Sequence, residues 1–120
     1  MILLFFNYEE DLNKVSRVIF ESLGINESLE GESSNVLGGV YYSFSIFGVK
    51  IKLEVNSYDY EDEYAYMLSI GKDLVSSMTV DDKIVDLIGE VVKRLLYIQL
   101  SLAVAEDKNN KLEIYTMPHS

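Results

Sequence analysis

Residues 38–55 read "GGVYYSFSIFGVKIKLEV" and contain the clearest secondary-structure pattern of the chain. On both sides of Gly48 the side chains alternate with a period of two, which is the pattern of half-buried strands. One face of the first strand carries Val40, Tyr42, Phe44 and Ile46, and the apolar face of the second carries Val49, Ile51, Leu53 and Val55. We therefore predict a β-hairpin of residues 39–47 and 49–55 that turns at Gly48.

Further strands are expected on both sides of this hairpin. Residues 64–70 alternate again and predict a third strand of the same meander. The apolar run "MILLFF" at residues 1–6 predicts a short, fully buried strand. Residues 100–106 and 111–117 can pair as a second hairpin across the connecting "DKNN".

The first helix is expected near residues 8–23, where apolar side chains recur at helical spacing. Asn7 can cap its start, with Glu10 three residues later completing a capping box. Gly24 suits the left-handed position that often ends a helix. The polar, serine-rich residues 25–37 that follow predict a loop.

The second helix is expected near residues 80–98. Thr79 is the expected cap, and the aspartates that follow it lie in the first turn, where the helix dipole favours carboxylates. The apolar face of this helix carries Ile84, Leu87, Ile88, Val91, Val92, Leu95 and Leu96. The helix could continue to residue 105, but an end near residues 97–99 leaves residues 100–106 free to form a strand.

The order of these elements predicts a single α+β domain over residues 1–120, with a mainly antiparallel sheet and two helices packed against one face. The chain has 120 residues, enough for one domain, and 48% hydrophobic residues, as in globular proteins. The absence of cysteine excludes disulfides and thiolate metal sites and fits a reducing cytoplasm. The "MILLFF" run lacks the basic leader of a signal peptide, and no apolar run is long enough to span a bilayer. We therefore expect a soluble, cytoplasmic protein.

The charge of the chain indicates the kind of partner. Twenty acidic residues against ten basic ones give a formal net charge of −10. This excess would repel nucleic acid and anionic membranes, and it favours the capture of a cationic partner. Nine of the acidic residues lie in two windows without a basic residue, between Arg17 and Lys50 and between Lys52 and Lys72. Solubility alone does not require such clustering.

Signals of catalysis or metal binding are weak. The single histidine, His119, stands one residue from the chain end, and no phosphate loop, dinucleotide or nucleophile motif is present. Asp59, Glu61 and Glu63 have the first spacings of an EF-hand calcium loop, but Tyr64 stands where that loop requires glycine. We therefore predict no enzyme activity, no cofactor and no metal site.

The stretch "SYDYEDEYAY", residues 57–66, contains four tyrosines and four acidic residues. Tyr64 and Tyr66 share the parity of the apolar residues in the following strand and are expected in the core. The predicted partner-binding residues combine tyrosine, which is enriched at interfaces, with clustered charge: Tyr58, Asp59, Tyr60, Glu61, Asp62 and Glu63. The open alternative is an ordinary solvated loop, in which case the site would move to the acidic window from Glu21 to Glu32.

A small, acidic, cysteine-free α+β chain with "GGVYYSFSIFGVKIKLEVNSYDYEDEYAYMLSI" at residues 38–70 resembles the immunity proteins of bacterial polymorphic toxins and contact-dependent growth inhibition systems. The resemblance implies a cytoplasmic antidote that binds one cognate toxin domain, in many cases a nuclease with a basic active site, and blocks it. It assigns no individual binding residues, so the predicted site rests on the charge pattern. Two other interpretations stay open: an acidic nucleic-acid mimic or general adaptor that binds many basic proteins weakly, and an enzyme with a carboxylate site.

Overall fold

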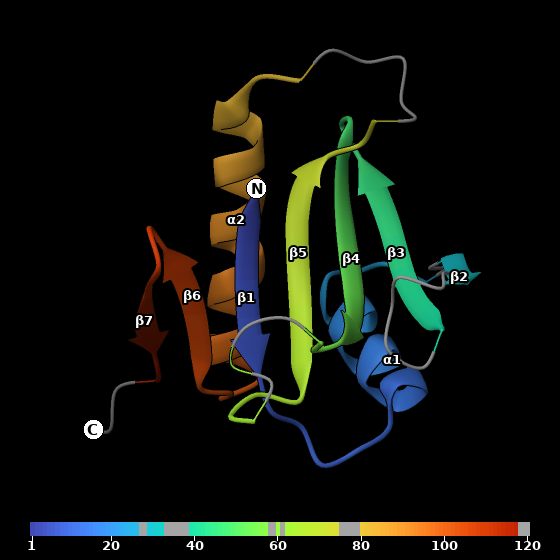
Figure 1. The fold of residues 1–120 in the computed structure, drawn as a ribbon. Coiled ribbons are helices and arrows are strands. Elements are labelled where there is room, and N and C mark those ends of the chain that lie inside the picture. Colours follow the sequence, from blue (N-terminus) through green and yellow to red (C-terminus); the bar gives the residue numbers. More distant parts are fainter. Residues whose placement is uncertain (27–28, 33–38, 58–59, 61, 75–79, 118–120) are drawn as a thin grey trace.

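The computed structural model describes residues 1–26, 29–32, 39–57, 60, 62–74 and 80–117. Among these residues, seven strands form one antiparallel sheet in the order β2-β3-β4-β5-β1-β6-β7 (Figure 1). The strands are β1 (Ile2–Phe6), β2 (Leu29–Glu32), β3 (Val40–Ile46), β4 (Val49–Val55), β5 (Tyr66–Lys72), β6 (Val104–Lys108) and β7 (Lys111–Tyr115). The helices are α1 (Leu12–Ser22) and α2 (Asp82–Arg94), and a π-helical segment, η1 (Leu95–Gln99), continues α2.

Both helices cover the same face of the sheet. α1 packs on β4, and α2 runs along β1 and β5 (Figure 1). The main core between helices and sheet includes Leu4, Phe6, Val15, Ile19, Leu53, Leu68, Ile70, Val85, Val92 and Leu96. The predicted α+β class is therefore confirmed, with the buried strand β1 hydrogen-bonded between β5 and β6.

The predicted hairpin at Gly48 is confirmed. β3 and β4 pair in the register Ile46↔Val49 and Tyr42↔Leu53. Phe47 and Gly48 form the two-residue turn, and both have a positive φ, at 52° and 75°. A turn with positive φ at both central residues matches the twist of the flanking strands, which explains the glycine at the second position.

The start of the first helix differs from the prediction. α1 begins at Leu12, and Asp11 caps it by accepting a hydrogen bond from the Lys14 amide at 3.0 Å. The predicted capping box of Asn7 and Glu10 is therefore wrong. Asn7 is instead held outside the helix, because its side chain bonds the backbone that leads into β5.

The end of the second helix agrees with the predicted end near residues 97–99, and the alternative of a continuous helix to residue 105 is wrong. α2 gives way to the π-helical segment at Leu95, and Ser101 then takes a positive φ of 55°. Because of this break, β6 begins at Val104 rather than at residue 100. The cap is Asp81, which accepts from the Lys83 amide at 2.9 Å, and the predicted cap Thr79 lies outside the described residues.

The face that α2 presents to the sheet is rotated from the predicted one. Val85, Gly89, Val92 and Lys93 are the buried residues, whereas Leu87 and Val91 are 62% and 60% exposed. Gly89 explains the rotation, because a Cβ at this position would lie 2.1 Å from the Ile2 side chain. The spacing of apolar side chains, from which the buried face was predicted, gives no sign of a glycine contact of this kind.

One strand was not predicted. Residues 25–37 were expected to form a loop, but β2 pairs with β3 in the register Gly31↔Tyr41. The Tyr41 ring occupies the space above Gly31, where a Cβ would lie 2.2 Å from the ring. The four residues "LEGE" of β2 lack an alternating apolar pattern, so the tyrosine across the ladder, rather than local propensity, accounts for the pairing.

Candidate functional site

Tyr60 and Tyr64 pack on the face of the sheet that carries no helix, which we call the open face. The Tyr60 ring meets Phe5 edge-on at a centroid distance of 5.6 Å, and the Tyr64 ring lies 6.3 Å from the same side chain. Met67 and Ala105 complete this second, smaller core. Tyr60 and Tyr64 are thus anchored against the sheet rather than extended into solvent.

The structure places the predicted binding residues as follows. Tyr60 is half-buried, Asp62 and Glu63 are exposed, and Tyr58, Asp59 and Glu61 lie outside the described residues. Tyr66 is buried in the main core, as predicted. Tyr64 does not share its face, because β5 begins only at Tyr66 and Tyr64 packs on Phe5 instead.

A side chain that the sequence assigned to a helix cap organises this region. Asn7 Nδ2 donates to the Glu63 carbonyl at 2.8 Å, and Asn7 Oδ1 accepts from the Ala65 amide at 2.8 Å. These two bonds hold the β1–α1 connection against the β4–β5 connection. The described acidic residues of both connections thereby gather at one end of the sheet. We call this surface the acidic end and define it by Glu9, Glu10, Asp11, Asp62 and Glu63, all exposed.

The acidic end has little neutralising charge. Within the described part of the chain, Glu10 alone among the five carboxylates has a cationic partner, Lys14 at 3.3 Å. These negative charges affect the ionisation of Tyr66, which lies beneath the acidic end. Burial raises the pKa of Tyr66 above its ordinary value, and the carboxylates of Asp11 and Glu10 raise it further. The Tyr66 hydroxyl also donates to the Glu10 carbonyl, which ties the acidic end to the core.

The electrostatic effect extends toward β2. Burial is the main cause that raises the pKa of Tyr42, and the carboxylates of Glu30 and Asp11 add to it. The Tyr42 hydroxyl donates to Glu30 at 3.1 Å and accepts from Asn13 at 3.0 Å. The sequence indicated two separate acidic windows. In the folded chain, the Asp11 carboxylate lies close enough to raise the pKa of both Tyr42 on β3 and Tyr66 on β5.

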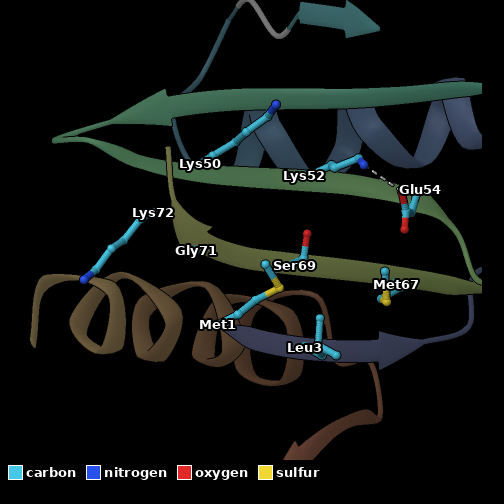
Figure 2. Close-up of a pocket in the computed structure, with 9 residues that line it drawn as sticks. All are labelled: Met1, Leu3, Lys50, Lys52, Glu54, Met67, Ser69, Gly71 and Lys72. Atoms are coloured by element: carbon cyan, nitrogen blue, oxygen red, sulfur yellow. Dashed lines mark ion pairs between the residues drawn. The ribbon is translucent and has the colours of Figure 1, made fainter. Parts of the chain in front are cut away.

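The open face also contains a hollow of about 220 Å³, which we call the trough. Its lining comes from three neighbouring strands: Lys50, Lys52 and Glu54 on β4, Met67, Ser69 and Gly71 on β5, and Leu3 on β1 with Met1 before it. Figure 2 shows the Ser69 hydroxyl directed toward β4, across the floor of the trough. Lys72 stands at the rim, points toward α2 and pairs with Asp82 at 3.1 Å (Figure 2).

Glu54 is the unusual residue of the trough, because its side chain is only 4% exposed on a face without helices. The Lys52 ammonium group forms an ion pair with Glu54 Oε2 at 3.2 Å, and this buried oxygen has no hydrogen-bond partner among the described residues. The sequence predicted a half-buried strand in which Lys50, Lys52 and Glu54 alternate with apolar residues. Nothing in that alternation distinguishes the buried carboxylate from the two lysines.

The helix side has an apolar groove of about 250 Å³ between α2 and the tip of the β3–β4 hairpin. Phe47, Leu87 and Val91 line it and are all more than half exposed. An exposed apolar patch of this kind is a common feature of interaction surfaces. The groove is therefore an alternative to the acidic end as a partner-binding surface.

No protein-family model, curated protein or solved structure matches the chain. Within the described residues, no group of three or more histidine or carboxylate side chains lies close enough to hold a metal ion. No helix in this part of the chain is long and apolar enough to cross a membrane. The functional argument therefore rests on the surfaces described above.

Proposed function

We propose that this protein is an immunity protein, which binds a cognate bacterial toxin domain through the acidic end and neutralises it by covering a basic surface. The observation that carries the proposal is the joining of two acidic connections by the Asn7 side chain. That arrangement presents five exposed carboxylates together and places one cation beside them. Clusters of one sign of charge steer a partner of the opposite sign during encounter.

Charge alone does not account for lasting affinity. Exposed ion pairs contribute only about 0–1 kcal/mol each, so a tight complex needs a few buried contacts. Tyr60 is suited to this role, because it is half-buried beside Asp62 and its ring is already packed on Phe5. A side chain that is ordered before binding loses less conformational freedom in the complex.

The Tyr60 carbonyl is also hydrogen-bonded to the residues that lead into β5. It accepts hydrogen bonds from the amides of Glu63 at 3.0 Å and Tyr64 at 2.9 Å. Tyr60 has a positive φ of 65°, which is unfavourable for a residue with a Cβ. The turn therefore holds Asp62 and Glu63 in a defined position relative to the tyrosine, as a pre-organised binding surface requires.

The proposal requires a toxin domain encoded next to this gene, and that domain is the partner to test. Its binding should be measured by calorimetry beside a panel of unrelated basic proteins such as cytochrome c and histones. A 1:1 complex with the toxin that is at least about a thousandfold tighter than binding to the panel supports an antidote, since that ratio corresponds to about 4 kcal/mol. Weak, strongly salt-dependent binding to every basic protein would instead identify an acidic adaptor or nucleic-acid mimic.

A further inference from the structure

We propose that two copies of this chain associate through an apolar stripe on α2 and η1, packed antiparallel about a two-fold axis at Val91. The stripe consists of Ile84, Leu87, Val91, Leu95 and Ile98. It forms one wall of the apolar groove beside the β3–β4 hairpin, where Leu87 and Val91 are lining residues. The inference does not depend on the proposed function, because the stripe shares no residue with the acidic end.

Helical geometry places the stripe on one face. Residues three or four positions apart lie on the same side of a helix, and the members of the stripe follow this spacing. Val85, Gly89 and Val92 bury the opposite side of α2 against the sheet. The stripe continues through η1, because a second hollow of about 280 Å³ places Leu95 and Ile98 together with Val91.

The exposed apolar side chains of the described residues gather around this stripe. Ten large apolar side chains are exposed in this part of the chain, and six of them belong to the stripe or to the adjoining hairpin tip. They are Ile46, Phe47, Ile84, Leu87, Val91 and Ile98, with exposed fractions from 36% to 67%. Gathering of this kind marks an interaction surface, because scattered apolar residues would not form a continuous patch.

The area of the patch is near that needed for a dimer. Each of the six exposed side chains presents roughly 100 Å² to solvent, which gives about 600 Å² in all. A standard interface buries about 800 Å² on each partner. Half-buried Leu95 and the exposed rim residues Arg94 and Gln99 extend the patch toward that size.

The spacing of the stripe selects a second copy as the occupant. Ile84 and Ile98 lie seven residues on either side of Val91, and Leu87 and Leu95 lie four residues on either side. In an antiparallel pair with a two-fold axis at Val91, positions at equal distances before and after it face each other. Ile84 therefore faces Ile98 of the second copy, Leu87 faces Leu95, and Val91 faces itself. Every apolar residue of the stripe meets an apolar residue.

The charge beside the stripe is compatible with this pairing. Arg94 is the one charged residue that lines the groove or the second hollow within the described part of the chain. It lies three residues after Val91 and therefore faces Ile88 of the second copy. The apolar stem of an arginine can cover such a side chain while the guanidinium group stays in water. The guanidinium group keeps its ion pair with Glu90, at 3.0 Å.

The net charge of −10 on each copy opposes association, and the antiparallel arrangement reduces this effect. α2 runs in the same direction as β1, which leads to the acidic end (Figure 1). Two antiparallel copies of α2 therefore place the two acidic ends at opposite ends of the dimer. Each copy is 44 Å long, and the repulsion between exposed charges is screened beyond about 10 Å at 0.1 M salt.

The test is sedimentation equilibrium of the purified full-length protein at concentrations up to about 1 mM. We expect the average mass to rise reversibly with concentration, from 13.7 kDa toward twice that value. Val91→Glu places two carboxylates face to face at the two-fold axis and should weaken association at least about tenfold. Leu87→Glu is a second variant with the same expected direction, since Leu87 is 62% exposed and tolerates a charge in the monomer.

Ile114→Glu is the matched control, because Ile114 is 63% exposed but lies on β7. It should leave the association unchanged, and thermal unfolding at low concentration shows that each variant is folded. A constant mass of 13.7 kDa at every concentration would overturn the proposal and leave the groove to a different partner. Equal weakening by Val91→Glu and Ile114→Glu would overturn it as well.

A mixture of two charged variants tests the antiparallel register. Ile84→Glu and Ile98→Lys should each weaken association of the variant with itself about tenfold. Their mixture should associate more tightly than either variant alone, because the introduced carboxylate faces the introduced ammonium group. A mixture of Ile84→Lys and Ile98→Lys places like charges face to face and is the control. Equal association in the two mixtures would contradict the antiparallel pairing.

Discussion

Two lysine–glutamate pairs in the described part of the chain are largely shielded from solvent, and they are built differently. Lys93 of α2 lies 3.0 Å from Glu106 of β6, with side chains that are 7% and 11% exposed. It also reaches Glu90 at 2.9 Å, so its cation has two carboxylate partners. The pair of Lys52 and Glu54 lies on the open face, where Lys52 is 29% exposed and Glu54 Oε2 makes no hydrogen bond.

The difference separates a lysine with two carboxylate partners from a lysine with one. Burial lowers the pKa of Lys93, but its hydrogen bonds to Glu90 and Glu106 outweigh burial and raise the pKa above its ordinary value. The ammonium group also lies 4.0 Å from the centre of the Tyr115 ring, which stacks on Tyr97. This closed network joins the helix to the edge of the sheet, whereas the Glu54 pair joins two residues of one strand.

The largest expected effect is on the closed network. Lys93→Ala leaves Glu106 buried without its cation, and breaking a buried pair in this way costs about 3–5 kcal/mol of unfolding free energy. Urea unfolding measures the loss. Arg94→Ala is the matched control, because Arg94 also bonds Glu90, at 3.0 Å, but is exposed, and we expect little change. If Lys93→Ala lowers the unfolding free energy as little as Arg94→Ala does, the Lys93 network does not stabilise the fold.

The two glutamates can be compared by the same substitution. Glu54→Leu should change the unfolding free energy by less than about 1 kcal/mol, because the carboxylate that it removes lacks a hydrogen bond. The ammonium group of Lys52, which loses its partner, is exposed enough to be hydrated by solvent. Glu106→Leu should cost about 2 kcal/mol, because it removes a charged hydrogen bond from the buried Lys93. Unfolding curves of both variants in urea give the difference. An equal loss of unfolding free energy in both variants would show that the two glutamates contribute alike to stability.

The acidic end has its own fixed contact, the Asn7 side chain. Asn7→Ala should lower the unfolding free energy by about 1–2 kcal/mol, since two hydrogen bonds of ordinary strength are lost. Hydrogen exchange of the Ala65 amide reports the change locally, because that amide donates to Asn7. If the Ala65 amide stays as protected as before, Asn7 does not hold the two connections together.

The smallest expected effect is on the titration of Tyr66. Glu10→Gln should lower the pKa of Tyr66 by a fraction of its upward shift, because burial remains the largest cause. A pKa raised in the folded state means that the stabilising effect is complete below about pH 10, the ordinary tyrosine pKa, and declines as the pH rises through the folded value. Tyr66→Phe should therefore flatten the alkaline decline in stability.

NMR titration of the Tyr66 ring measures this shift directly. Glu21→Gln removes an exposed carboxylate elsewhere on α1 and should leave the titration unchanged. An unaltered Tyr66 pKa in Glu10→Gln would show that the field of the acidic end does not reach the core.

The parts of the fold that follow a repeating apolar pattern could be predicted from the sequence. The hairpin at Gly48 has such a pattern, and a slip of one residue would expose its whole apolar face. β2 has no such pattern and depends on the contact between Gly31 and the Tyr41 ring. The orientation of α2 likewise depends on the contact between Gly89 and Ile2, which joins residues far apart in the sequence.

The candidate site was predictable in its charge but not in its geometry. The sequence showed that Asp62 and Glu63 belong to an acidic, tyrosine-rich stretch. It did not show that Asn7 joins this stretch to Glu9 and Glu10, because asparagine before a helical pattern equally well predicts a cap. The buried state of Glu54 depends on the side chains around it on the folded sheet, which the alternation along β4 does not reveal.

We propose that the acidic end steers a basic toxin domain onto this protein. The most direct test is the association rate with the toxin domain encoded beside the gene, measured by stopped flow at several salt concentrations. The double variant Asp62→Asn, Glu63→Gln removes two charges from the acidic end. The double variant Asp82→Asn, Asp86→Asn removes two exposed charges from α2 and is the matched control. We predict that the first variant associates several-fold more slowly at low salt with a flatter salt dependence, while the control associates like the wild type. An unchanged rate in the first variant, or the same slowing in both, would contradict the claim.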